Sequence, residues 1–327
     1  MDLFCYSIVI RTLGNAGEKY SRLLESIEKQ TVKPLEVIVV IPHGYTLDCQ
    51  KGNERVVYSE KGMVSQRSVG IQEARGEFLL VLDDDVAFSP DFVEKMHTCM
   101  VERELDCVLA FGENNVQNDP SESPKGRQRV KETLKRLRGA FTGQYFYSNR
   151  RYAYFDTITR TAGHRTYVNE TEKLCQTGCF QCFFIKRESA VETHFEDEKW
   201  LEQGTLSQYA AYDDAVFFYK AFSHGCRIAY TSDTNYLHLD AAAGRSAKDK
   251  LTSKKIRLYT IARNRTVFWR RHILTNRPGA LTWIAGFYGL GNYALYSTVI
   301  NLLPKNWPAI AALFAGYRDA IRFIRNK

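Results

Sequence analysis

The chain lacks the usual marks of a secreted protein. Its N-terminus, MDLFCYSIVIRTL, has no basic leader and an apolar run too short for a signal peptide, so we expect a cytosolic chain that begins with a strand. The eight cysteines are scattered and do not show the spacing of a secreted disulfide framework, which predicts reduced, buried thiols. Acidic residues are nearly absent from the tail, because residues 250–327 contain 14 Lys or Arg and one acid, Asp319.

This imbalance gives the tail a charge of +13, whereas the 249 residues before it carry 31 basic and 36 acidic side chains, or −5. A basic tail predicts an anionic partner, with phospholipid and nucleic acid as the candidates. Residues 280–303 contain no charge over 24 positions, a length that permits a membrane span. Three glycines and two asparagines dilute its hydrophobicity, and both flanks are basic. We therefore expect helices that lie on an anionic membrane surface, and no nucleic-acid partner, because no binding module is recognisable.

Three cysteines admit two interpretations. Cys175, Cys179 and Cys182 have the C-x3-C-x2-C spacing with which radical enzymes hold an iron–sulfur cluster. In those enzymes an aromatic residue usually precedes the last cysteine, whereas this chain has Gln181. The segment GCFQCFFIKR is also typical of a strand, in which cysteines pack as small apolar residues, and we favour that interpretation.

Strands and helices alternate through the first 82 residues. The segments at 6–12, 36–41, 55–60 and 78–82 are rich in apolar residues and are strand candidates, and helical spacing of apolar residues is found at 18–31 and 62–74. Strands without polar alternation, separated by helices, indicate a parallel sheet that is covered on both faces. In such α/β folds ligands bind outside the carboxyl ends of the strands.

Three adjacent carboxylates, Asp83, Asp84 and Asp85, follow the apolar run at 78–82. Helix capping does not explain them, because Ser89-Pro90-Asp91 already provides an N-cap, a proline at the first helical position and an acid in the first turn. Adjacent carboxylates raise each other's pKa unless a cation or hydrogen-bond donors are present. All-oxygen ligands favour Mg2+ or Mn2+ shared with substrate phosphates, although solvated loop acids remain the alternative.

A second pair of acids, Asp213 and Asp214, precedes an apolar helical segment at 215–223. Taken alone, the pair is typical of carboxylates that cap a helix N-terminus. Residues 227–245 then predict a strand and a loop that carries His238. A single histidine is more often an ordinary core or surface residue than a metal ligand.

The order of these segments resembles the inverting glycosyltransferases of family 2, which have the GT-A fold. The resemblance is carried by the strand-end Thr12, by SIEKQT before EVIVV, by KGMVSQRSVGIQEARGEFLLVLDDDV, by TGCFQCFFIKRES and by Asp213-Asp214 before a helix. It implies a mostly parallel α/β sheet with flanking helices at 1–245, followed by a basic, amphipathic helical region at 246–327 that associates with a membrane. It also implies transfer of a sugar from a nucleoside-diphosphate sugar to a saccharide or lipid-linked acceptor, in surface polysaccharide synthesis on the inner face of the cell membrane.

The resemblance also implies roles for individual residues. Thr12, Arg67, Asp83 and Asp84 would contact the nucleotide sugar, and Asp85 with His238 would hold Mg2+ or Mn2+. On the acceptor side, Gly178 and Asp213 would frame the site, and Asp214 would be the catalytic base. Two departures are visible: Ser68 replaces the usual Asn after Arg67, and Ile41-Pro42-His43 stands where the family has an Asp that reads the nucleobase.

Other classes of function remain open from the sequence. A nucleotidyltransferase of similar fold would need no base at Asp214, and a non-catalytic nucleotide-sugar binding protein would leave the donor intact. The basic segment at 125–141 has apolar residues on one helical face. It is typical of a solvated basic helix, but it could also frame the acceptor or rest on a membrane.

Overall fold

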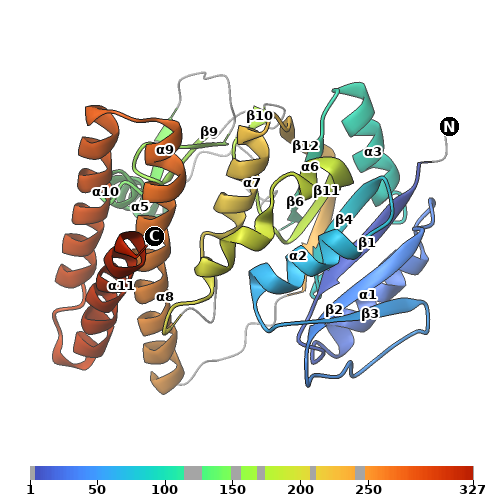
Figure 1. The fold of residues 1–327 in the computed structure, drawn as a ribbon, viewed down its shortest axis with the longest axis horizontal. Helices are drawn as coiled ribbons and strands as arrows, with labels where there is room; N and C mark the ends of the chain where they lie inside the picture. Colours follow the sequence, from blue (N-terminus) through green and yellow to red (C-terminus); the bar gives the residue numbers. More distant parts are fainter. Residues whose placement is uncertain are drawn as a thin grey trace.

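The computed structural model describes residues 4–113, 127–148, 156–167, 174–206, 211–239 and 247–326, and the observations below concern those residues. A mixed sheet has the strand order β10-β12-β6-β11-β4-β1-β2-β3, with β5 paired to β12 (Figure 1). Its strands are β1 (Tyr6–Arg11), β2 (Glu36–Pro42), β3 (Glu54–Ser59), β4 (Phe78–Asp83), β5 (Val86–Phe88), β6 (Cys107–Gly112), β10 (Leu174–Cys175), β11 (Cys182–Lys186) and β12 (Ile228–His238).

Most neighbouring strands are parallel, as the sequence predicts. β1 pairs in parallel with β2 and β4, β2 with β3, and β6 with β12. β11 is antiparallel to both β4 and β6, and it connects the two parallel groups. The strands predicted at 6–12, 36–41, 55–60 and 78–82 are confirmed with shifts of one residue at their ends.

Helices cover both faces of this sheet, because successive buried residues of each strand point to opposite sides. Val9, Val40 and Val81 pack with α2 and α7 on one face, whereas Ile10, Val39 and Leu82 pack with α1 and α3 on the other. The elements that flank the sheet are α1 (Glu18–Glu28), α2 (Met63–Glu73), α3 (Phe92–Glu102), α6 (Arg187–Val191), η1 (Phe195–Leu201) and α7 (Asp213–Ser223).

The start of α3 corrects one expectation. The helix begins at Phe92, so Pro90 lies outside it, and Asp91 is the N-cap residue without a side-chain hydrogen bond to the helix. The hydroxyl of Ser89 donates instead to Asp91 Oδ1 at 2.6 Å. The predicted cap was displaced because residues 86–88 form β5 and delay the helix.

Two of the three clustered cysteines lie in different cores. Cys175 belongs to β10 and packs in the core beneath α7, whereas Cys182 of β11 packs in the core on the opposite side of the sheet. A sheet between the two thiols prevents both from binding one iron–sulfur cluster. These cysteines therefore act as small apolar core residues, which is the favoured interpretation from the sequence.

A helical region lies beside the α/β part (Figure 1). Its helices are α5 (Arg127–Phe141), α8 (Ala247–Phe268), the π-helix η2 (Trp269–Ile273), α9 (Leu274–Asn276), α10 (Ala280–Val299), η3 (Pro304–Asn306) and α11 (Trp307–Arg325). A small sheet of order β7-β9-β8 accompanies it, formed by β7 (Tyr145–Ser148), β8 (Asp156–Ile158) and β9 (His164–Tyr167). None of the described helices has both the length and the apolarity that crossing a membrane requires.

Hydrogen bonds of Arg265 connect α8 to two segments that are distant in the sequence. Its guanidinium is fully buried and donates hydrogen bonds to the carbonyl oxygens of Thr142, Gly143 and Thr161 at 2.7–3.1 Å. These carbonyls belong to the turn after α5 and to the turn between β8 and β9. Because a buried guanidinium must have its donors satisfied, this contact holds both turns against the helical region.

Glu198 forms a second buried junction, between the α/β part and the C-terminal helices. Its carboxylate, 1% exposed, accepts hydrogen bonds from Lys220 Nζ of α7 at 2.9 Å and from His272 Nε2 of η2 at 3.3 Å. Burial opposes ionisation of this carboxyl, but the His272 and Lys220 partners prevail and lower its pKa to about 2. Glu198 is therefore an ionised group whose charge is balanced only in the folded state.

We expect Glu198→Gln to lower the free energy of unfolding by about 3 kcal/mol, because it leaves the largely buried Lys220 ammonium without its carboxylate. The pKa of Glu198 is about 2 in the folded protein against 4.5 for an ordinary glutamate. The carboxylate thus stabilises the fold above pH 4.5, and this contribution falls as the pH decreases toward the folded-state pKa.

Urea unfolding of both forms at neutral pH and at about pH 3 measures the effect. Glu196→Gln is the matched control, because Glu196 pairs with His194 through side chains that are 38% and 63% exposed. An equal loss in the two variants, or a difference that does not shrink in acid, would contradict the assignment.

Candidate active site

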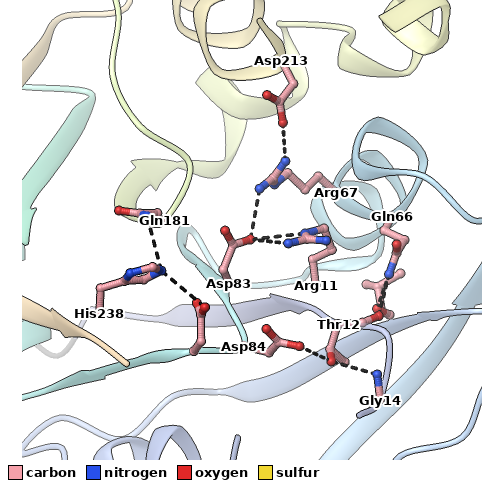
Figure 2. Close-up of polar contacts among 12 residues, drawn as sticks. Arg11, Thr12, Gly14, Gln66, Arg67, Asp83, Asp84, Gln181, Asp213 and His238 are labelled. Atoms are coloured by element: carbon pink, nitrogen blue, oxygen red, sulfur yellow. Dashed lines mark hydrogen bonds and ion pairs between the residues drawn. The ribbon is translucent and has the colours of Figure 1, made fainter. Parts of the chain in front are cut away.

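Arg67 of α2 lies between the two groups of acidic residues, with its side chain 1% exposed (Figure 2). Its Nη2 is 3.0 Å from Asp83 Oδ1, and its Nη1 is 2.6 Å from Asp213 Oδ2. The guanidinium carbon also lies 4.1 Å from the centre of the Phe180 ring, which stabilises a cation that has left water. One buried cation therefore joins the end of β4 to the start of α7.

Asp83 receives a second cation from the neighbouring strand. Arg11 is the last residue of β1 and is the register partner of Asp83 in the parallel ladder. Its Nη2 and Nε lie 3.1 and 3.2 Å from the same Asp83 oxygen, Oδ1. Two arginines thus offset the repulsion expected among three adjacent carboxylates.

Asp84 points toward the end of β1, where the Thr12 hydroxyl donates a short hydrogen bond to Asp84 Oδ2. The Gly14 amide in turn donates to the Thr12 hydroxyl oxygen at 2.9 Å. Gln66 Nε2 reaches the carbonyls of Thr12 and Val40 at 2.8 and 2.9 Å and ties α2 to both strand ends. Burial raises the pKa of Asp84 more than the Thr12 hydrogen bond lowers it.

Asp85 and His238 face each other from adjacent strand segments. Asp85 Oδ2 is 3.3 Å from His238 Nε2, and both side chains are 20% exposed. Gln181 Nε2 lies 3.4 Å from the same histidine nitrogen, while the Tyr236 hydroxyl donates to Gln181 Oε1 at 2.6 Å. This chain of contacts holds the imidazole beside Asp85. Figure 2 shows Gln181 next to the His238 ring.

The acids at 213–214 do not cap α7 in the expected way. Tyr212 is the N-cap residue, in the left-handed conformation with φ 78°, and no side-chain cap hydrogen bond forms. Asp213 turns to Arg67, whereas Asp214 Oδ1 accepts a hydrogen bond from the Ala215 amide at 2.7 Å. The helix N-terminus stabilises this carboxylate charge, but the helix does not use Asp213 as its cap.

Burial raises the pKa of both acids. For Asp213 the pKa reaches about 6, because burial and the neighbouring Asp214 charge outweigh the attraction of Arg67. The pKa of Asp214 is also raised, chiefly by burial, although the Ala215 amide and Arg67 act against the increase. A carboxylate with a raised pKa is a stronger base that can still be ionised near neutral pH.

Gly178 supports α7 through close packing. A Cβ atom at this position would lie 2.7 Å from Leu109 Cδ1 and 3.1 Å from a ring carbon of Phe218. Glycine therefore allows the segment before β11 to approach both β6 and α7. This close approach keeps Cys179, whose pKa is raised by burial and then by Asp214, near the acids of α7.

The side chains at the strand ends could supply some of the ligands of a hard divalent cation. Asp83 Oδ1 is already held by two arginines and Asp84 Oδ2 by Thr12, which leaves Asp85 and His238 as the pair best placed to hold an ion. In the described ranges no three His, Cys, Asp or Glu side chains are grouped to bind one metal. A metal shared with substrate phosphates needs only one or two protein carboxylates, so the two residues fit such an ion.

Seven of the nine predicted site residues fall into three sets of mutual contacts, and Asp214 and Gly178 belong to none of them. Arg67, Asp83 and Asp213 form one, Thr12 and Asp84 a second, and Asp85 with His238 a third. The sequence analysis missed Arg11, Gln66, Gln181 and Phe180, which position these sets. Only Arg11 carried a usable signal, namely a basic residue at the carboxyl end of a strand.

The arrangement is that of an α/β protein with a cluster of acidic residues at the carboxyl ends of its strands, where ligands of such folds bind. The sequence model for Glycosyl transferase family 2 matches residues 7–190, which is more than half of the chain. The chain belongs to this family.

Curated relatives match shorter stretches. An uncharacterized glycosyltransferase, YwdF, of Bacillus subtilis (strain 168) is 38% identical over 97 residues, which cover 28% of this chain and 36% of that protein. Glycosyltransferase GlyG of Streptococcus pneumoniae serotype 4 is 26% identical over 121 residues, or 34% of this chain and 40% of that protein. The matched regions therefore span little more than a third of these relatives.

Two solved structures are similar over nearly the whole chain. S. aureus TarS 1–349 in complex with UDP-GlcNAc is 15% identical, with 98% of this chain and 92% of that chain covered and a TM-score of 0.42. Mannosyltransferase PcManGT from Pyrobaculum calidifontis, in complex with GDP-Man and Mn2+, is 13% identical, with 97% and 86% covered and a TM-score of 0.49. Likeness at this level is weak, and the family assignment rests on the sequence model.

Replacement of Arg67 by Met should lower the free energy of unfolding by about 3 kcal/mol, because Asp83 and Asp213 would lose a buried counter-charge. Arg67→Lys should restore only part of this loss, since one ammonium group lacks the fork that reaches both carboxylates. The measurement is denaturant unfolding at pH 7.

Arg55→Met serves as the control. Arg55 also contacts two carboxylates, Glu36 and Glu73, but its side chain is 35% exposed. Its removal should cost less than about 1 kcal/mol. Equal losses of unfolding free energy for Arg55→Met and Arg67→Met would show that the buried bridge stabilises the fold no more than the exposed one.

Proposed function

We propose that the protein transfers a sugar, with inversion at the anomeric carbon, from a nucleoside-diphosphate sugar to a hydroxyl group of a saccharide or lipid-linked acceptor. The observation that supports this most directly is the buried Arg67 bridge between the acids after β4 and the acids that begin α7. It holds two carboxylate sets close together, and a single displacement uses one set for the leaving group and the other for the nucleophile. Nucleotidyl transfer would need the first set alone.

On the donor side, Asp83, Asp84, Thr12 and Arg67 would orient the nucleotide and the sugar. Asp85 and His238 would hold Mg2+ or Mn2+, which when bound stabilises the charge that develops on the departing nucleoside diphosphate. Asp83 is held by Arg11 and Arg67, so its second carboxylate oxygen is directed without loss of entropy when the donor binds.

On the acceptor side, Asp214 would accept the proton of the attacking hydroxyl. Its raised pKa suits this role, because burial makes the carboxylate a stronger base than an ordinary aspartate. Asp213 would hold Arg67 in place and keep a negative group beside the base. Gly178, packed against Phe218 of α7, would let the acceptor-side segment approach the helix.

The division at residues 245 and 246 would separate the catalytic domain from a membrane-associating region. α10 exposes large apolar side chains, among them Leu281 at 70%, Ile284 at 65% and Phe287 at 69%. Apolar side chains of this kind on a basic region suit the interface of an anionic membrane better than water. Such a position on the inner face of the cell membrane would bring a lipid-linked acceptor of surface polysaccharide synthesis to the cluster of acidic residues.

Asp214→Asn should leave donor affinity within about twofold and lower the transfer rate at least about a hundredfold, because the amide cannot accept the hydroxyl proton. Asp85→Ala should instead weaken metal-dependent donor binding by about tenfold or more. Calorimetric titration with UDP-, dTDP- and GDP-sugars, with and without Mn2+, measures binding, and release of nucleoside diphosphate measures turnover.

Asp233→Asn is the control, because Asp233 lies on β12, away from the two groups of acids, and its carboxylate accepts a hydrogen bond from the Thr231 hydroxyl at 3.0 Å. Full turnover by Asp214→Asn would exclude its role as base. Release of pyrophosphate from a nucleoside triphosphate would instead identify a nucleotidyltransferase, and binding without turnover would identify a nucleotide-sugar binding protein.

The pH profile of kcat should show an acid limb above the ordinary aspartate pKa of 3.8, because burial raises the pKa of Asp214 and only the ionised carboxylate is a base. As the pH falls through the raised pKa, the base is protonated and kcat decreases tenfold per unit. Rates at saturating donor, with donor binding checked at each pH, test this expectation. A kcat that remains constant down to about pH 4 would contradict it.

A further inference from the structure

A cavity of about 280 Å³ lies between η2 and the end of α11, and none of the acidic residues of the candidate active site lines it. It is lined by Arg270, Arg271, His272, Thr275, Phe323 and Ile324. It adjoins the C-terminal part of α7, because Asn276 Nδ2 is 3.4 Å from the Ser223 hydroxyl. The acids Asp213 and Asp214 are at the opposite end of that helix, so the cavity is separate from the candidate active site.

Cations outnumber carboxylates at this cavity. Glu198 is the acid found beside it, and this one carboxylate is already held by Lys220 at 2.9 Å and His272 at 3.3 Å. Arg271 reaches only 4.0 Å from Glu198, and its Nε is shielded from water without a hydrogen-bond partner among the described residues. Arg270 is exposed and forms no ion pair with any residue that the structure describes. An anion in the cavity would supply a hydrogen-bond acceptor for Arg271 and a counter-charge for Arg270.

The π-helical turn brings the basic residues together. η2 contains Arg270, Arg271 and His272 in succession, and a π-helix has more residues in each turn than an α-helix. Consecutive side chains therefore diverge by a smaller angle about the axis, so three adjacent residues can line one cavity. Two planar guanidinium groups and the Thr275 hydroxyl match the oxygens of a phosphate group.

The other side of the same turn meets the exposed face of α10. The Trp269 ring lies 5.2 Å from that of Trp283 in an edge-to-face arrangement, and 6.5 Å from that of Phe287. Phe287 is 69% and Trp283 is 44% exposed. A basic cavity thus adjoins an aromatic, solvent-facing surface, while Phe323 and Ile324 form an apolar wall of the cavity.

From these contacts we propose that the cavity is a phosphate-binding site. Arg270 and Arg271 hold the phosphate oxygens, Thr275 donates a further hydrogen bond, and Phe323 and Ile324 contact the organic part of the ligand. The phosphate group belongs either to a lipid headgroup, which the neighbouring aromatic surface favours, or to a soluble phosphate. The site requires no sugar transfer, so its failure and that of the proposed function are separable.

The first experiment uses inorganic phosphate and the full chain. Calorimetric titration at constant ionic strength, with sodium chloride as the reference salt, should show binding to the unaltered protein. Arg270→Gln/Arg271→Gln should weaken it by at least about tenfold, through loss of charge-assisted hydrogen bonds. Arg318→Gln/Arg322→Gln removes the same charge from α11, outside the cavity lining, and should leave the affinity unchanged.

The second experiment identifies the source of the phosphate. Cosedimentation with phosphatidylcholine vesicles, with and without phosphatidylglycerol, compares the same proteins. If a lipid headgroup is the ligand, the cavity variant loses binding to phosphatidylglycerol vesicles more than the control variant does, and inorganic phosphate competes. Loss of phosphate binding with unchanged vesicle binding assigns the site to a soluble phosphate.

The single substitution Arg270→Gln tests whether a loss of binding is caused by misfolding. Arg270 is exposed, and its removal leaves the Glu198 junction intact. This variant should show the same direction of change in both experiments, with an unaltered thermal unfolding profile. Absence of phosphate binding by the unaltered protein, or equal losses in the cavity and control variants, would overturn the proposal.

Discussion

The structure depends on the contact of one buried guanidinium with two carboxylates that are 130 residues apart in the chain. Arg67 is 1% exposed and reaches Asp83 and Asp213 within 3.0 Å. A buried charge is costly unless it is paired, so neither carboxylate can move away without stranding Arg67. The bridge therefore positions α7, with Asp214 at its start, relative to the strand ends that carry the other acids. The two groups of acids acquire a fixed separation from a contact that is itself part of the fold.

The same principle operates where the C-terminal helices meet the α/β part. Glu198 joins η1, α7 and η2, and Arg265 joins α8 to the turns at 142–143 and 161. Each junction is a single buried ion whose partners come from distant segments. Such contacts contribute less to the free energy of folding than to the selection of one helix arrangement. A shifted helix would leave a charge unpaired in a low-dielectric interior. The cavity at η2 arises beside one of them, where the basic residues exceed the available carboxylate.

The sequence predicted the elements that depend on local pattern. The apolar strands at 36–41 and 78–82, the amphipathic helix at 18–31 and the helix after Asp214 were confirmed, because burial on one or both faces imposes a regular spacing. The helix cap predicted at Ser89-Pro90-Asp91 was placed too early in the chain, since pairing of β5 with β12 competes with the local helix signal. The contacts of Gln181 and Phe180 were not foreseen either, because their partners lie in segments far away in sequence.

Strand periodicity and motif order by themselves determined the α/β class, the family and the two groups of acids. The grouping of those acids was decided only by the tertiary structure: Asp83 with two arginines, Asp84 with Thr12, and Asp85 with His238. In the sequence, Asp83, Asp84 and Asp85 are identical neighbours that nothing distinguishes. They acquire different partners because the strand end turns them toward β1, α2 and β12, and those neighbours are assembled by the fold.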